Sequence, residues 1–212
     1  MLMILLATAA STQFPVPPKL ISSRPIEYPE QMVEQSKDGF MRAQLTVSPA
    51  GKLVHCDVIA SSGVAELDAA ACQSFAVSRF KPARDDVGNP SFGTVAISFF
   101  FLIRGQMLKS PPAADLSLVV NHMPPGIGPF SKREAALTVG ADGKVQACRS
   151  IVEKESENAL DRVVCSMAMS RLTFKPALDE NGKPVLSIQE FSVEFSDTNA
   201  PTQRSVRSPS PA

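Results

Sequence analysis

The sequence lacks the features that mark several large classes of protein. Its 21 basic residues are balanced by 21 acidic ones and form no basic run, so the electrostatic footprint of a nucleic-acid partner is missing. It contains no G-x-S-x-G, no H-E-x-x-H, no phosphate-binding glycine loop and no Cys-His catalytic pair. Two histidines and widely spaced cysteines do not fit a zinc site. We therefore expect no enzyme activity, no cofactor and no metal.

No apolar run is long enough to predict a membrane span, which needs about 20 apolar residues. Residues 1–14, MLMILLATAASTQF, resemble the apolar core of a secretory signal with an A-x-A-like site, although the usual positive n-region is missing. This segment favours export over the alternative of a disordered terminus in a cytosolic protein. The other apolar run, FGTVAISFFFLI, is rich in strand formers and predicts a strand.

The 18 prolines cluster outside the periodic segments, which is typical of linkers around compact units. A length of 212 residues fits one medium domain or two small ones. The expected boundaries are a signal-like segment at 1–14, a Pro-rich linker at 15–26, a first domain at 27–104, a linker at 105–125, a second domain at 126–196 and a disordered tail at 197–212.

The chain contains an internal repeat. FKPARDDVGNP at 80–90 and FKPALDENGKP at 174–184 share FKPA-x-D-x-x-G-x-P without a gap. Upstream, LTVSPAGK at 45–52 matches LTVGADGK at 137–144. Because the spacing between these matches is nearly constant, the sequence predicts two copies of one domain.

Each copy shows the same order of local patterns. Alternating apolar residues over 40–47 predict a half-buried strand, and a turn containing Gly51 leads into a second strand at 53–60. An alanine-rich helix is expected at 66–78 and a last strand at 92–103. The predicted fold class is α+β, with two tandem β-β-α-β domains, each a small antiparallel sheet covered by a helix on one face.

The four cysteines fall into two matched pairs. Cys56 lies on the second strand and Cys72 on the helix, and Cys148 and Cys165 repeat this arrangement downstream. If the helix covers the sheet, the two sulfur atoms of each copy face each other across the core. We expect the disulfides Cys56–Cys72 and Cys148–Cys165, because an even cysteine count fits an oxidising compartment. The alternative is two buried free thiols in each core.

The sequence supports further predictions for two single residues and for one strand. His55 is interpreted as the outward-facing neighbour of a core residue, and Lys175 as a side chain that ends in water. In the last strand of the second copy, Leu186 and Ile188 share one phase whereas Phe191 and its alternate neighbours share the other. This change of phase predicts a β-bulge near Gln189-Glu190.

The first copy resembles the TonB C-terminal domain. The resemblance lies in Tyr28-Pro29, GFMRAQLTVSPAGKLVHCDVIASSG, LDAAAC, RFKPA and the apolar last strand, and it covers residues 28–103. Cys56 and Cys72 stand where the family has apolar core residues, which supports the disulfide interpretation. The second copy keeps LTV, DGK, LD and FKPA but lacks the YP and SSG motifs, so it is a divergent match.

The resemblance implies a non-enzymatic periplasmic module that binds proteins or peptides, including segments of outer-membrane receptors, by adding a strand to an exposed edge. The implied edge is the last strand of the first copy, with the even residues Thr94, Ala96, Ser98, Phe100 and Leu102. Its apolar end suggests a cover, either the second copy or a partner. In the second copy, Glu190 and Glu194 guard the same edge, because charged edges discourage pairing.

The resemblance also implies an alternative function. Family members act as energy transducers for outer-membrane transport, but this sequence shows neither a full-length N-terminal membrane helix nor a long Pro-Lys/Pro-Glu spacer. A TonB-type transducer or accessory role therefore requires a longer N-terminus than the one given.

Overall fold

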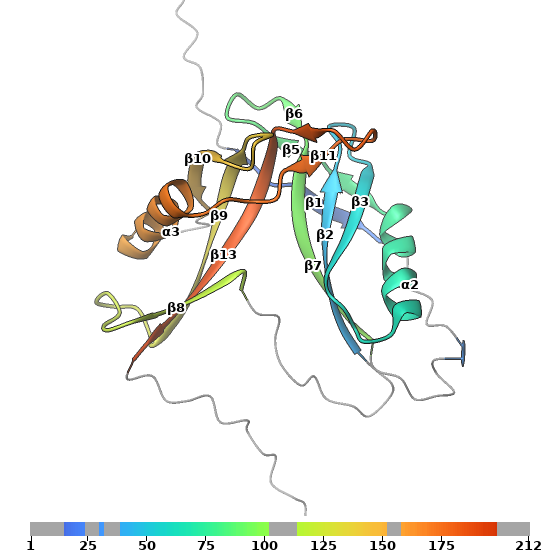
Figure 1. Ribbon diagram of the computed structural model, residues 1–212. Helices are drawn as coiled ribbons and strands as arrows, with labels where there is room; N and C mark the ends of the chain where they lie inside the picture. The colour runs from blue at the N-terminus through green and yellow to red at the C-terminus, as the bar shows by residue number, and fades with distance from the viewer. Residues whose placement is uncertain (1–14, 24–29, 32–38, 102–113, 152–157, 199–212) are drawn as a thin grey trace, which may run out of the picture.

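The computed structural model describes residues 15–23, 30–31, 39–101, 114–151 and 158–198, and Figure 1 shows their arrangement. One seven-stranded sheet dominates this part of the chain, in the order β10-β9-β13-β7-β2-β3, with β8 also paired to β13. Its strands are β2 (Gly39–Val47), β3 (Leu53–Ala60), β7 (Gly93–Phe101), β8 (Leu116–Val120), β9 (Phe130–Val139), β10 (Val145–Ser150) and β13 (Ser187–Asp197). The helices are α2 (Ala65–Ala76) and α3 (Ala159–Arg171).

Three short ladders lie outside this sheet. They pair β1 (Lys19–Ser22) with β4 (Arg79–Lys81), β5 (Ala83–Arg84) with β6 (Pro90–Ser91), and β11 (Ala177–Leu178) with β12 (Pro184–Val185). The last two are the hairpins formed by the two FKPA motifs. Both place an alanine, Ala83 or Ala177, in a buried position.

The first half of the molecule, residues 39–101, builds one core. β2 lies between β3 and β7 and is antiparallel to both. Its odd residues from Met41 to Val47 are fully buried against α2, whose residues Leu67, Ala71 and Phe75 point inward, and against Phe101 at the end of β7. The period-2 pattern of β2 and the spacing of the inward helix residues therefore converge on the same face.

The second half, residues 114–198, repeats this order of elements and adds one strand. β9 lies between β10 and β13, and α3 covers its odd residues through Leu160, Val164 and Ala168. The added strand, β8, runs parallel to β13 from Val193 onward. An α+β fold is thereby confirmed.

The two halves join through β7 and β13. These strands are parallel and pair at only two positions, Gly93 with Ile188 and Thr94 with Gln189, before they diverge as Figure 1 shows. Paired residues share a face of a sheet. Thr94 lies on the face of β7 away from α2, and Gln189 lies on the α3 side of β13, so the two helices cover opposite faces of the joined sheet.

Both disulfides are confirmed. Cys56 is bonded to Cys72, with 5.8 Å between their Cα atoms, and Cys148 is bonded to Cys165, with 5.4 Å. Each bond ties the outer strand of its half, β3 or β10, to the helix that covers the sheet.

The repeated turn glycines have a steric explanation. Gly51 and Gly143 adopt positive φ angles of 74° and 80°, a region that favours glycine. In addition, a Cβ at either position would overlap the carbonyl oxygen of the FKPA phenylalanine, Phe80 or Phe174. The Gly-Lys turn and the FKPA motif therefore recur together because they are in contact.

The aspartate of each Leu-Asp motif links the end of a strand to the start of a helix. Asp68 accepts hydrogen bonds from Ser61 Oγ at 2.6 Å and Ser62 N at 2.9 Å. Asp161 accepts them from Ser150 Oγ at 2.7 Å and Asn158 N at 2.8 Å. This shared role accounts for the identity of the motif in the two halves.

Two segments that we expected to be linkers contain strands. Lys19–Ser22 forms β1 against β4, and Leu116–Val120 forms β8 against β13. β8 forms because Leu116, Leu118 and Val120 pack on the core of the second half. These two strands were not predicted from the sequence.

The predicted β-bulge in β13 is also wrong. The β9–β13 ladder is regular from Ser187 to Ser196. Leu186 precedes the strand and is exposed, whereas Ile188 is fully buried beneath Ala83 and Ala136. The start of β13 is therefore buried on both faces, which produces apolar residues in both phases without any change of register.

Candidate functional site

The edge of β7 is only partly covered. Ile188 N donates a hydrogen bond to Phe92 O at 2.9 Å, so the main-chain polar groups of Phe92 and of the even residues after it point away from β2. The main-chain polar groups of Thr94 face β13. In the part of the chain that the structure describes, no strand pairs with this edge at Ala96, Ser98 or Phe100. This stretch can accept another strand.

A cavity of about 350 Å³ lies where β7 and β13 diverge. We call it the interstrand groove. Ala96 and Ser98 from β7 line one side, and Glu190 and Ser192 from β13 line the other. The remaining lining residues are Arg42, Asp115 and Lys132. The open edge of β7 therefore borders a hollow of the size of a ligand pocket, about 300 Å³ or more.

Asp115 lines the groove and links the two halves. Its carboxylate lies 2.7 Å from Arg42 Nη2 on β2. It also accepts hydrogen bonds from Ser192 N at 2.7 Å and Ser192 Oγ at 2.8 Å. The main-chain amide of Ser192, which would otherwise be an open edge donor on β13, is thus occupied by a side chain.

Glu190 is the one groove carboxylate without a partner among the described residues. Asp115 pairs with Arg42, and Lys132 pairs with Glu134 at 2.8 Å, but among the described residues no hydrogen bond or ion pair reaches the side chain of Glu190. Burial raises the pKa of Glu190, and the nearby charge of Glu134 raises it further against the opposing effect of Lys132. The groove therefore has a local excess of negative charge at this side chain.

A second cavity, of about 270 Å³, adjoins the groove on the α3 side. Asp115 and Glu190 line both hollows. The wall of the second one is more apolar, with Leu116, Leu172 and Phe191 among its residues. Glu190 thus lies between a polar hollow and an apolar one.

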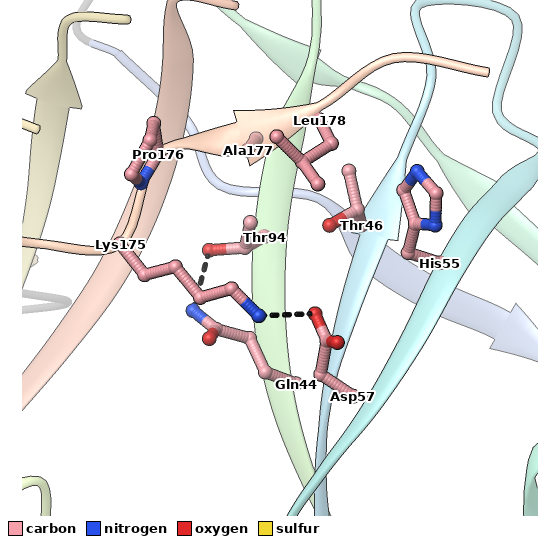
Figure 2. A pocket seen from close by; sticks show the side chains of 9 residues that line it. All are labelled: Gln44, Thr46, His55, Asp57, Thr94, Lys175, Pro176, Ala177 and Leu178. Atoms are coloured by element: carbon pink, nitrogen blue, oxygen red, sulfur yellow. Dashed lines mark hydrogen bonds and ion pairs between the residues drawn. The ribbon is translucent and has the colours of Figure 1, made fainter. Parts of the chain in front are cut away.

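Above the groove, the second FKPA motif covers the outer face of the first half, as Figure 2 shows. Lys175 Nζ lies 3.3 Å from Asp57 Oδ2, and His55 Nε2 donates a hydrogen bond to the carbonyl oxygen of Asp179 at 2.9 Å. Only about 10 Å³ remains free between the loop and the sheet, so this place is a filled contact. His55 points away from the core as expected, and Lys175 pairs with an acid instead of ending in water alone.

The expected edge residues take different places. Thr94 is buried and paired with Gln189, so β13 occupies the edge there. Ala96 and Ser98 line the groove. Phe100 is half-buried with its ring 5.0 Å from that of Phe40, which is therefore one cover of this apolar end. Leu102 lies outside the described residues.

Most of the edge of β13 is also occupied. Beyond the two pairs with β7, Val193 to Asp197 pair with β8, and this range includes Glu194. Sequence reasoning missed Asp115 because it assigned 105–125 to a linker. The alternation of Leu116, Leu118 and Val120 directly after it was the available signal.

Two negative findings concern the described ranges only. No helix there is long and apolar enough to cross a membrane. No group of three or more His, Cys, Asp or Glu side chains in those ranges is arranged to hold a metal ion.

An open strand edge beside a groove is the geometry that interaction modules use to bind an extended segment by strand addition. Residues 24–102 match the family model described as the Gram-negative bacterial TonB protein C-terminal, which confirms the resemblance for this segment. Domains of this family are periplasmic, non-enzymatic and interact with proteins. The match includes β2, β3, α2 and β7, and it ends before β8. No curated protein matches the chain.

Proposed function

We propose that the chain is an exported, periplasmic protein-binding module that captures an extended segment of a partner by strand addition to β7. The open main-chain edge at Ala96, Ser98 and Phe100 carries this proposal. The family match and the two disulfides support it, because disulfides persist in oxidising compartments. Segments of outer-membrane receptors are the partner class that we favour.

We further propose that residues 126–196 are a divergent second copy of the domain. The identical order of hairpin, helix and last strand supports this, as do the equivalent roles of Gly51 and Gly143. In this proposal the second copy no longer offers an edge, since β7 and β8 cover β13, and it instead forms one wall of the groove.

A proline at Ser98 tests strand addition directly. The Ser98 amide points into the groove and takes no part in the β2–β7 ladder, so Ser98→Pro removes one edge donor and leaves that ladder intact. Ser98→Ala is the matched control because it keeps the amide. We expect peptides of receptor origin to perturb the amide signals of residues 95–101 in the control and in the native protein, and to fail with the proline variant.

The proposal is refuted if Ser98→Pro folds normally and binds the same peptides with unchanged affinity. Far-UV circular dichroism and the chemical shifts of residues remote from β7 establish that the variant is folded. Equal binding would place the partner at another surface.

A second candidate function is energy transduction or an accessory role in outer-membrane transport. The match of residues 24–102 to the TonB C-terminal family favours it. Fractionation of cells that express the native gene separates the two candidates, since a transducer is recovered with the inner membrane and a soluble module with the periplasmic extract.

A further inference from the structure

The charge of the interstrand groove is unbalanced in a specific way. Two cationic side chains, Arg42 and Lys132, and two carboxylates, Asp115 and Glu190, line the groove. A third carboxylate, Glu134, lies beside it and pairs with Lys132. Each cation is already paired, at 2.7 Å and 2.8 Å. The remaining carboxylate, Glu190, lines the hollow that borders the open part of β7.

An unpartnered carboxylate in a half-buried position is costly to the folded protein, because burial disfavours the charged form. Burial is the largest cause of the raised pKa of Glu190. Among the nearby charges, Glu134 raises this pKa more than Lys132 lowers it, and Asp115 raises it more than Arg42 lowers it. A cation that enters the groove would remove the imbalance. An anion would increase it.

We propose that the segment bound along β7 carries a lysine or arginine side chain that pairs with Glu190 in the interstrand groove. This inference rests on the proposed strand addition and names the chemistry that selects the partner. The main chain of the bound segment would pair with Ala96, Ser98 and Phe100, and one of its side chains would reach across the groove to β13. Because the unpaired charge in the groove is negative, charge complementarity favours a basic partner over an acidic one.

Two features of the site fit this chemistry. The groove has a volume of about 350 Å³ and is lined by Glu190, so it has room for a long side chain whose charged end lies at the carboxylate. Asp115 is held by Arg42 and by the Ser192 amide and hydroxyl, which leaves Glu190 as the available acceptor.

The test uses the full chain and a set of end-capped nine-residue peptides of alternating threonine and valine. In one series, each peptide carries lysine, glutamine or glutamate at its central position. In a second series, the same residue stands at the adjacent position, because a shift of one residue reverses the face of a strand. Binding is followed by the amide signals of Ala96, Ser98 and Phe100. We expect the lysine peptide to bind about tenfold more tightly than the glutamine peptide, and the glutamate peptide to bind most weakly.

Two variants locate the preference. Glu190→Gln should abolish the difference between the lysine and glutamine peptides. Glu194→Gln is the matched control, on the same strand where β8 already occupies the edge, and should leave the difference unchanged. A preference for lysine that persists in Glu190→Gln overturns the inference, since the cation would then bind elsewhere.

The remaining outcomes separate the inference from the proposed function. If all peptides shift the β7 amides with equal affinity, strand addition stands and the selection of a basic side chain is refuted. If none shifts them, strand addition to β7 fails and the inference fails with it. If the same amides shift with protein concentration alone, a second copy of the chain occupies the groove, and the inference is overturned.

Discussion

A methyl group at Gly93 should weaken the junction between the two halves. Gly93 is buried where β7 meets β13. A Cβ built there lies 2.6 Å from Ala83 Cβ, 2.7 Å from Ile188 O and 2.8 Å from Pro18 Cδ. Optimal contact between carbon atoms requires about 3.5 to 4.0 Å, so all three groups must move. One of them is a main-chain carbonyl in the ladder that joins the halves, which cannot move without loss of pairing.

We expect Gly93→Ala to lower the free energy of unfolding by about 1–3 kcal/mol, the usual cost of overpacking a filled site. Gly128→Ala is the matched control, because a Cβ at Gly128 meets nothing within 4 Å. Both substitutions reduce the entropy of the unfolded chain similarly, by about 0.4–1 kcal/mol, so this contribution cancels in the comparison. Urea unfolding followed by circular dichroism gives the difference between the two variants.

The amide signals of Thr94 and Gln189 report whether the loss of unfolding free energy arises at the junction of β7 and β13. A result in which Gly93→Ala and Gly128→Ala agree within about 0.5 kcal/mol would refute the close approach of β7, β13 and Ala83. A destabilisation with no change at Thr94 and Gln189 would show that the methyl group acts elsewhere.

Three further predictions concern single features. Replacing both Cys56 and Cys72 by alanine opens a loop with a sequence separation of 16 residues and should cost about 3 kcal/mol of unfolding free energy, measured in urea. Asn158→Ala removes the hydrogen bond to Leu160 N at the start of α3 and should cost about 1 kcal/mol, with faster amide exchange in the first turn. Glu190→Gln should stabilise the protein near neutral pH, because the raised pKa means that the folded state resists ionisation of this acid. The contribution of Glu190 to wild-type stability should accordingly fall as the pH rises from its unfolded-state pKa through its raised folded-state pKa, and the advantage of the variant should vanish below about pH 4, where the unfolded chain is also protonated.

The sequence predicts most of each half because the relevant signals are local. The alternation in β2 and the turn at Gly51 are properties of a few adjacent residues, and they define the hairpin. The cysteine pairing follows from the same local reasoning, since Cys56 and Cys72 lie on neighbouring elements of one hairpin-helix unit. These features could be predicted without knowledge of the rest of the chain.

The junction could not be predicted in this way. It depends on contacts between residues that lie far apart in the sequence, such as Gly93 with Ile188 and Ala83 with Ala136. Small residues at a close approach produce no periodic pattern. The pattern of β13 was misinterpreted for the same reason, because the burial of Ile188 comes from the other half of the molecule. The groove, which exists only where β7 and β13 diverge, was therefore beyond the reach of the periodicity argument.

The disulfide arrangement has a consequence for how the chain matures. Four cysteines allow three pairings, and the observed one joins consecutive cysteines, the first to the second and the third to the fourth. A chain oxidised from its N-terminal end as it leaves a translocation pore presents Cys56 and then Cys72 before either of the others appears. The first bond can therefore form correctly before a wrong partner exists, and the second pair then has no competitor. If the chain is exported as proposed, we expect oxidation alone to give the native pairing, with a yield that does not depend on a disulfide isomerase.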